Sequence, residues 1–312
     1  MSTVGSVVLS IDAELGWGFH DLESPPTDRV ESARRGWTTL LDLLDRHSVP
    51  ATWAVVGHLM LTDCDGEHAE HPAPPGWFER ERTTWADRHD LRFGPELIEA
   101  VLESRVDHEL ASHSFSHVLF GDPRTTRTLA DAELERAVEL ADDWGLELTS
   151  FVYPRNDVGH REALAEHGFR TYRGRNPHPE GVYRILEAAV VDRSLLVRPS
   201  IDEYGLVDIP ASLFLFGFEG RYRRLFESIW GDPMVRTACR GIDQAVDGDD
   251  DQVCHLWLHP NNLTGSRDDE RMEAILAYLE QRRRETDLRV ETMAEVAERC
   301  AGKRPSLTSP VS

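Results

Sequence analysis

"HELASHSFSH", residues 108–117, joins a short strand-like run to two histidines, His113 and His117, that lie four positions apart. If a helical turn begins where the strand ends, side chains four apart point the same way, as a pair of metal ligands must. An HxxxH pair also occurs without any metal, so it indicates a site only if other ligands lie nearby. His108 precedes the end of the strand and is expected to be structural.

Strand-like and helix-like segments alternate on both sides of this stretch. Such alternation predicts parallel strands joined by crossover helices, arranged as an open sheet or a closed barrel. No GxGxxG motif follows the first strand and no GxxxxGK[ST] motif occurs, which argues against a nucleotide-binding site. The expected strands are residues 4–11, 50–57, 106–113, 148–154, 170–174, 205–218, 252–260 and 288–293, and the expected helices are residues 30–47, 94–104, 129–145, 160–169, 221–230, 269–285 and 294–300.

The composition favours one large folded domain. Hydrophobic residues make up 40% of the 312 residues, enough for a sizeable core. We expect a single domain over residues 1–301 with a long inserted loop at about 60–93, and a disordered tail over 302–312. No apolar run approaches the ~20 residues of a membrane span. The N-terminus lacks the basic start and the cleavage site of a signal peptide, which predicts a cytoplasmic protein.

The chain is strongly acidic. With 56 Asp and Glu against 34 Lys and Arg, its net charge is -22, which disfavours binding to nucleic acid. Lys303 is the only lysine. An acidic, lysine-poor surface is typical of proteins from salt-rich cytoplasm, where a Debye length of ~3 Å at 1 M salt screens self-repulsion. We therefore predict a halophilic protein, with an acidic mesophilic protein as the alternative.

Four cysteines, at positions 64, 239, 254 and 300, form no CxxC pair. Cys254 lies within an apolar run, as a buried thiol would. We expect free thiols here and no disulfide or thiolate–metal site.

Polar residues suited to metal binding or catalysis stand at the ends of several expected strands. Because the carboxyl ends of parallel strands share one edge, these side chains should converge. Two imidazoles and one carboxylate make a three-ligand set that leaves metal positions open for water and substrate. Either carboxylate after the first strand could be the ligand, with the other free as a base. The residues are Asp12, Glu14, His113, His117, Tyr153, Arg155 and His259.

The histidine segment "DHELASHSFSH" resembles the metal-binding motif of the polysaccharide deacetylases, the NodB homology domains of carbohydrate esterase family 4. The first motif of that family, T-F-D-D, corresponds here to "SIDAE", residues 10–14. The resemblance implies that Asp12 is the catalytic base. Ala13 stands where the family has its carboxylate ligand, and Glu14 is the nearest substitute. It also implies a divergent member with a distorted, TIM-barrel-like (β/α) barrel over about residues 4–300, with gaps across 60–93 and 175–204.

Two further motifs are similar to those of the family. "FVYPRN", residues 151–156, resembles F-R-P-P-Y-G with the arginine moved behind the proline, which implies that Arg155 reaches Asp12. "LWLHP", residues 256–260, resembles the last motif and implies that Leu256 or Leu258 lines an acetyl pocket while His259 is the general acid. The fourth motif of the family has no convincing match.

The resemblance implies a metal-dependent hydrolase of C–N bonds that removes acetyl groups from an N-acetylated sugar or polysaccharide precursor. Glu14, His113 and His117 would hold one divalent ion; zinc suits this set, and cobalt or nickel would also fit. Trp77 and Trp85 of the inserted loop and Tyr153 are candidate substrate contacts. A hydrolase of a small cyclic amide or imide is one alternative, and a degenerate sugar-binding barrel, suggested by Ala13, is another. The sequence indicates no oligomeric state.

Overall fold

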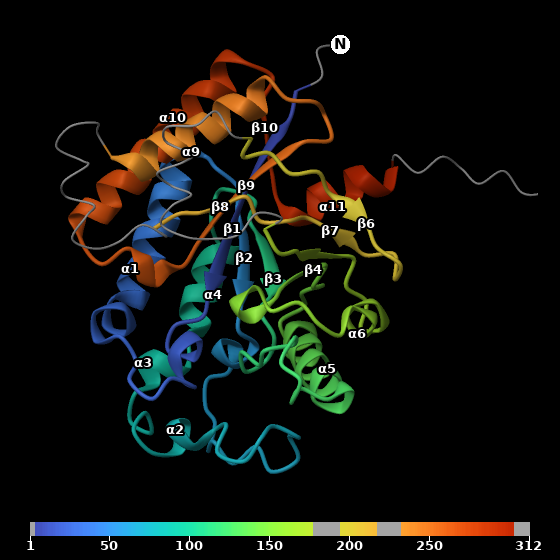
Figure 1. Cartoon of the computed structure of the whole chain (residues 1–312). Helices are drawn as coiled ribbons and strands as arrows, with labels where there is room; N and C mark the ends of the chain where they lie inside the picture. The colour runs from blue at the N-terminus through green and yellow to red at the C-terminus, as the bar shows by residue number, and fades with distance from the viewer. Residues whose placement is uncertain (1–3, 177–193, 217–231, 303–312) are drawn as a thin grey trace, which may run out of the picture.

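The computed structural model describes residues 4–176, 194–216 and 232–302. The helix expected at 221–230 and residues 303–312 of the expected tail lie outside these ranges. Figure 1 shows a curled sheet with helices packed around it, so the chain has the mixed α/β architecture that the alternation of segments predicted.

The strands within the described ranges form one ten-stranded sheet. Its order is β6-β7-β5-β4-β3-β2-β1-β9-β8, with β10 paired to β1 beside this path. The named strand pairs are parallel, except that β6 runs antiparallel to β7. The strands are β1 (Ser6–Ala13), β2 (Thr52–Val55), β3 (Glu109–Ser112), β4 (Ser150–Val152), β5 (Thr171–Arg173), β6 (Ser200–Ile201), β7 (Val207–Asp208), β8 (Leu213–Phe214), β9 (Val253–Leu258) and β10 (Arg289–Glu291).

The helices cover the outside of the curled sheet. α1 packs on α10 and α10 on α9 along one flank, while α5 and α6 cover the other (Figure 1). The α-helices are α1 (Thr27–His47), α2 (Glu79–Arg82), α3 (His89–Arg92), α4 (Pro95–Leu102), α5 (Arg127–Asp143), α6 (Arg161–Glu166), α9 (Pro233–Val246), α10 (Ser266–Glu285) and α11 (Met293–Gly302). The 3₁₀ turns are η1 (Trp17–Phe19), η2 (Gly57–Met60), η3 (Pro154–Asn156) and η4 (Pro260–Asn262).

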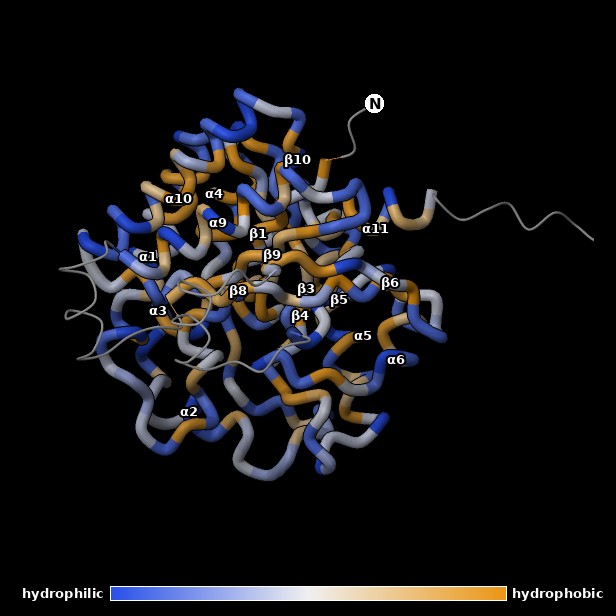
Figure 2. The backbone as a smooth tube through the Cα atoms, turned by 45° about the horizontal axis from the view of Figure 1, so that its top comes forward, coloured by the Kyte–Doolittle hydropathy of each residue, from blue (hydrophilic) through white to orange (hydrophobic). Residues whose placement is uncertain are grey.

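β1 lies at the centre of the core. All eight of its residues are buried, and it pairs with β2, β9 and β10. Figure 2 shows β1 and β9 as largely apolar segments, surrounded by helices in which polar and apolar residues alternate. A strand covered on both faces needs a mostly apolar sequence, and SVVLSIDA has five apolar residues, with two serines and Asp12 as its polar ones.

The single strand expected over 205–218 is wrong. The segment contains two short strands: β7 pairs with β5, and β8 pairs with β9. Pro210 lies between them. Because proline has no backbone N–H to donate, it interrupts a strand there.

Residues 61–94, here called the insertion, contain little regular structure apart from α2 and α3. The two ends of the insertion lie together, since Gly94 N donates to Leu59 O at 2.9 Å. Phe78, Trp85 and Leu91 are nevertheless buried, so the insertion packs on the rest of the fold. In the described part of the chain, no helix combines the length and apolarity that crossing a membrane requires.

Candidate active site

Glu14, His113 and His117 come together at the carboxyl edge of the sheet, just after β1 and β3. The Nε2 atoms of His113 and His117 lie 3.5 and 3.2 Å from Oε2 of Glu14. One potential ligand atom of each residue lies within 4.8 Å of the others, and all three side chains are buried. Of the two carboxylates left open by the sequence, Glu14 is therefore the one in contact with both imidazoles.

The helical turn expected at residues 113–117 is wrong. The segment is an irregular turn in which Ser114 and His117 have positive φ angles of 62° and 65°. His117 N donates to the Ser114 hydroxyl at 2.9 Å, as serine side chains often do in place of helical hydrogen bonds. The turn still brings the two imidazole rings together, with centroids 5.1 Å apart.

Two buried contacts hold this histidine turn. His113 Nδ1 donates to Val152 O at 2.7 Å, and because a carbonyl only accepts, Nε2 is left free for a ligand. Glu133 of α5 accepts from the backbone N–H and the hydroxyl of Ser116. Burial would raise the pKa of Glu133, but His71 and Ser116 outweigh it and lower the pKa. The sequence analysis missed Glu133, because in a helical pattern it resembles any surface glutamate.

Asp12 is held by Arg173, a residue that the sequence analysis did not single out. Two guanidinium nitrogens donate to the two carboxylate oxygens at 2.6 and 2.7 Å, and both side chains are buried. The guanidinium also lies 4.4 Å from the ring centroid of Trp257. Burial by itself would raise the pKa of Asp12, but Arg173, His113 and His259 outweigh it and lower the pKa. Asp12 is therefore held ionised.

Arg155 does not make the contact with Asp12 that the resemblance implied. Its NH2 donates to Asp21 at 2.5 Å, and the residue is more than a third exposed. Arg155 lies in η3, beyond the end of β4, whereas Arg173 is the last residue of β5. A signal for Arg173 was present, because it ends an expected strand at the same edge as the other candidates.

His259 faces both carboxylates of the site. Its Nε2 lies 3.6 Å from Oδ2 of Asp12 and 3.7 Å from Oε1 of Glu14. The His259 side chain is 21% exposed, whereas those of Asp12 and Glu14 are at most 5% exposed. Asn261 donates to Oε1 of Glu14 at 3.3 Å. Side chains following β1, β3 and β9 thus meet around Glu14.

The four expected substrate contacts occupy different environments. Tyr153 and Leu258 are fully buried in core clusters, and Trp85 packs with Phe19 and other apolar residues at 8% exposure. A substrate could touch these three side chains only after a rearrangement. Trp77 is partly exposed, and its Nε1 donates to the Ser116 hydroxyl at 3.0 Å.

A cleft of about 370 Å³ opens beside the histidine turn. Trp77 and His20 line it together with Asp21, the partner of Arg155. The centroid of the His20 ring lies 6.4 Å from that of His117, and burial lowers the pKa of His20 to about 4. The cleft therefore combines an aromatic wall with charged groups next to the Glu14 site.

The residues of the Glu14 site fit a divalent ion. Nε2 of His113 and Nε2 of His117 are buried without a hydrogen-bond partner among the described residues. Such nitrogens are costly to bury unless a ligand satisfies them. Burial would raise the pKa of Glu14, but His259, His113 and His117 outweigh it and hold the pKa well below its usual range. An ionised carboxylate and two imidazole lone pairs are a suitable donor set.

The family model described as Polysaccharide deacetylase matches residues 25–172. The matched segment contains the histidine turn and ends one residue before Arg173. Just under half of this chain thus matches the polysaccharide deacetylase family model. No curated protein matches its sequence significantly.

Solved structures share the fold of this chain at low sequence identity. A candidate polysaccharide deacetylase of Mycobacterium smegmatis is 18% identical with a TM-score of 0.63, covering 100% of this chain and 96% of that one. The Puue allantoinase is 13% identical with a TM-score of 0.60, covering 96% and 91%. A GH57-type branching enzyme of Pyrococcus horikoshii is 9% identical with a TM-score of 0.59, covering 96% and 71%.

These findings confirm the expected fold class, the distorted (β/α) barrel of the NodB type. The match to the polysaccharide deacetylase model indicates a hydrolase of carbon–nitrogen bonds. The individual roles of Asp12, Glu14, His113, His117 and His259 remain predictions. The structure places each of these side chains within contact distance of at least one of the others.

Gly18 allows the carboxylate of Glu14 to reach its position. A Cβ atom built on Gly18 would lie 2.1 Å from Oε1 of Glu14, far inside van der Waals contact. Gly18→Ala should therefore displace Glu14 and weaken metal binding by about 10–100-fold, the usual effect of disturbing the support of a metal ligand. Metal titration followed by calorimetry measures this. Gly265→Ala is the control, since nothing lies within 4 Å of its Cβ; equal affinities in the two variants would contradict the prediction.

Proposed function

We propose that this protein is a metal-dependent amide hydrolase that removes the acetyl group from an N-acetylated sugar or sugar precursor. The observation that carries the proposal is the meeting of a Glu14–His113–His117 ligand set with an ionised Asp12 and with His259. These residues supply the separate parts that amide hydrolysis needs: ligands, a base and an acid.

Asp12 is the general base in this proposal. Its carboxylate accepts two hydrogen bonds from Arg173, which fix its orientation and keep it ionised. A fixed, ionised carboxylate next to the ligand set is placed to take a proton from the attacking water. Arg173 acts as a positioning residue, since it touches Asp12 and lies over the Trp257 ring.

His259 is the general acid. An amide nitrogen leaves poorly without a proton, and His259 is the most exposed member of the site, facing both carboxylates. A divalent ion held by Glu14, His113 and His117 would supply Lewis-acid polarisation of the attacking water and of the acetamide carbonyl. The donor set suits zinc, and cobalt or nickel would also fit it.

The depth of the site favours a small or terminal sugar residue over the middle of a polymer. Asp12, Glu14, His113 and His117 are each at most 4% exposed. The adjoining cleft of about 370 Å³ has room for roughly one sugar ring, given that ligand pockets usually span about 300–1,000 Å³. Trp77 at its wall offers an aromatic face to the ring, as expected from the sequence.

Substrate assays test the proposal directly. Purified protein with one added equivalent of zinc, cobalt or nickel is incubated with N-acetylglucosamine, its short oligomers and nucleotide-linked N-acetyl sugars, and released acetate is measured. We expect metal-dependent acetate release that is faster from small or terminal residues than from internal ones. Metal-independent release, or none from any N-acetyl sugar, would contradict it.

Hydrolysis of a small cyclic amide is the second candidate. An allantoinase shares the fold over most of both chains, and a deep site suits a compact ring as well as a sugar. Ring opening of small cyclic amides and imides, assayed in parallel with acetate release, separates the two substrates. A degenerate sugar-binding barrel would turn over neither and would retain no metal at the Glu14 site.

We also propose that the acidic surface is an adaptation to salt, whereas a cytoplasmic location stays a prediction. A net charge of -22 repels itself strongly at low ionic strength. The melting temperature should rise by roughly 5–10 °C or more between 0.1 and 2 M KCl, as screening removes a few kcal/mol of repulsion. Sucrose at equal osmolality is the uncharged control. A melting temperature that does not depend on KCl would contradict halophilic adaptation.

A further inference from the structure

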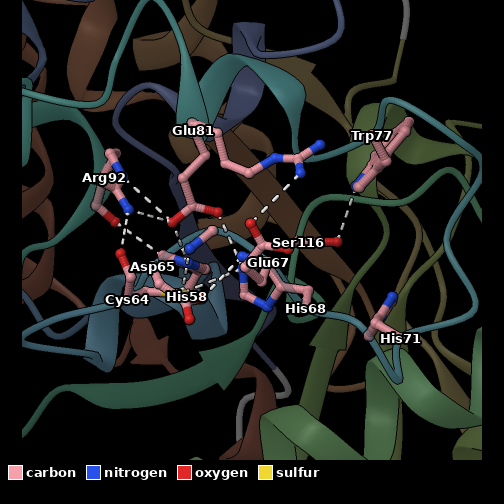
Figure 3. Close-up of polar contacts among 12 residues, drawn as sticks. His58, Cys64, Asp65, Glu67, His68, His71, Trp77, Glu81, Arg92 and Ser116 are labelled. Atoms are coloured by element: carbon pink, nitrogen blue, oxygen red, sulfur yellow. Dashed lines mark hydrogen bonds and ion pairs between the residues drawn. The ribbon is translucent and has the colours of Figure 1, made fainter.

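A second cluster of metal-ligating side chains lies in and beside the insertion. His58 of η2 meets Cys64, His68 and Glu81 of the insertion, and one potential ligand atom of each lies within 4.8 Å of the others. His58 Nε2 lies 2.9 Å from Oε1 of Glu81, and His68 Nε2 lies 3.0 Å from Oε2 of the same carboxylate. Cys64 Sγ lies 3.3 Å from His68 Nε2. Figure 3 shows the four side chains pointing toward one another.

These separations are close to those of a tetrahedral site. Zinc bonds of about 2.0–2.1 Å to nitrogen and oxygen and about 2.3 Å to sulfur place neighbouring ligand atoms roughly 3.3–3.6 Å apart. The observed 2.9–3.3 Å would need to open by only a few tenths of an ångström. The set differs from the Glu14 site because four protein ligands close a tetrahedron, which is typical of structural zinc.

The contacts of His58 favour a cation between its ring and Glu81. His58 Nδ1 donates to Arg92 O at 3.2 Å, so in the neutral ring Nε2 carries a lone pair. That nitrogen is fully buried, 2.9 Å from Glu81 Oε1, yet makes no hydrogen bond of acceptable geometry. Two acceptors facing each other at this distance repel, and a cation between them removes the repulsion.

The backbone orients the sulfur of Cys64 within the cluster, although burial raises the pKa of its thiol to about 11. Gly66 N donates to Sγ at 3.4 Å, and a donor stabilises the charged form of a group. Gly66 has a φ of 75°, a conformation that glycine adopts without strain. The turn therefore directs a backbone N–H at the sulfur.

An ion-pair network without a metal is the competing explanation. Arg92 NH2 donates to Glu81 Oε1 at 2.7 Å and to Cys64 O at 2.7 Å. This pair accounts for the burial of Glu81, but not for the thiol and the two imidazole nitrogens that share the same space. Contacts from outside the ligand set that orient a carboxylate are usual at metal sites.

We propose that His58, Cys64, His68 and Glu81 form a second, structural metal site that binds a divalent ion of the zinc type. The ion links His58 of η2 to three points of the insertion, a segment with little regular structure. The same insertion contributes Trp77, which donates to Ser116 of the histidine turn, and His71, whose Nε2 lies 3.2 Å from Glu133. The second ion thus holds in place the insertion residues that support the histidine turn and line the cleft.

Cobalt spectroscopy of the whole chain tests this proposal. Metal-free protein is titrated with Co²⁺, and the thiolate-to-cobalt charge-transfer band in the near ultraviolet is recorded. The Glu14 site has no sulfur ligand, so this band reports on the second site whether or not the first one binds metal. We expect the band in the wild type and in Cys239→Ser, and its complete loss in Cys64→Ser. No band in the wild type, or a band that survives Cys64→Ser, overturns the proposal.

Metal content gives a second readout from the same preparations. Wild-type protein loaded with zinc and dialysed should retain one equivalent more than Cys64→Ser, measured by mass spectrometry. If Cys64→Ser does not fold, Glu81→Gln takes its place and should weaken cobalt binding at least tenfold while the charge-transfer band remains at saturating cobalt. Equal zinc contents in the wild type and the folded variant would overturn the second site without affecting the proposed hydrolase activity.

Discussion

Replacing His117 with alanine should remove the metal from the Glu14 site and lower kcat/KM for deacetylation by about 10³-fold or more. The ligand set has only three side chains, and the His117 Nε2 lies 3.2 Å from Glu14 in a buried position. Loss of Lewis-acid stabilisation costs several kcal/mol in the transition state, and each ~1.4 kcal/mol is a factor of ten in rate. Metal analysis and acetate release on the same sample measure both effects.

A surface histidine provides the matched control for this variant. His89 begins α3, is exposed, and lies outside both clusters, so His89→Ala should keep the metal and the rate of the wild type. The two sites are distinguishable as well, since His117→Ala should retain the thiolate–cobalt band of the second site. Full metal content together with full activity in His117→Ala would remove the basis for the proposed active site.

The fold could be predicted from the sequence because it depends on patterns that are local. β1 is a mostly apolar, fully buried run, and helices such as α1 show apolar spacing with Arg46 and His47 in the last turn. The prediction of one strand over residues 205–218 failed, because the segment forms two strands that pair with different neighbours. Which neighbour a two-residue strand pairs with is decided by tertiary contacts, and hydrophobic pattern cannot specify them.

The candidate site was predictable where it obeys one geometric rule. Glu14, His113 and His259 all follow parallel strands, so their convergence could be inferred. Arg173 obeys the same rule, since it ends an expected strand. The family motif, however, predicts Arg155 as the partner of Asp12. Family motifs give residue order, whereas the partner of a buried carboxylate depends on which strand lies close enough in space.

The second cluster could not be predicted in the same way. Its ligands stand at positions 58, 64, 68 and 81, without a CxxC pair or a regular period. They meet because the insertion folds back on η2, and no periodic pattern describes such a path. All four cysteines are free in the structure, as expected, but spacing rules for compact motifs could not indicate that Cys64 lies beside two histidines and a glutamate.

Asp12→Asn should keep the metal of the Glu14 site while turnover falls by ~10²–10⁴, the usual contribution of a positioned general base. Asp12 makes its closest contacts with Arg173, at 2.6 and 2.7 Å, whereas Glu14 contacts both ligand histidines. Glu14→Gln should therefore show the opposite result, with weak metal binding. If Asp12 were instead the principal ligand, the metal contents of the two variants would be exchanged.

The asparagine also leaves the buried Arg173 guanidinium without its charged partner, so lost activity must be separated from lost stability. Removing one partner of a buried ion pair costs on the order of 3–5 kcal/mol. Asp268→Asn is the matched control, because Asp268 is a buried acid that contacts the buried Arg271 at 3.3 Å. The Asp268→Asn variant should have a lower melting temperature and an unchanged kcat. Both variants are assayed with metal bound, at a temperature where both are fully folded. If Asp12 is the base, kcat falls in Asp12→Asn under these conditions. Normal turnover in Asp12→Asn would leave Asp12 without a catalytic role.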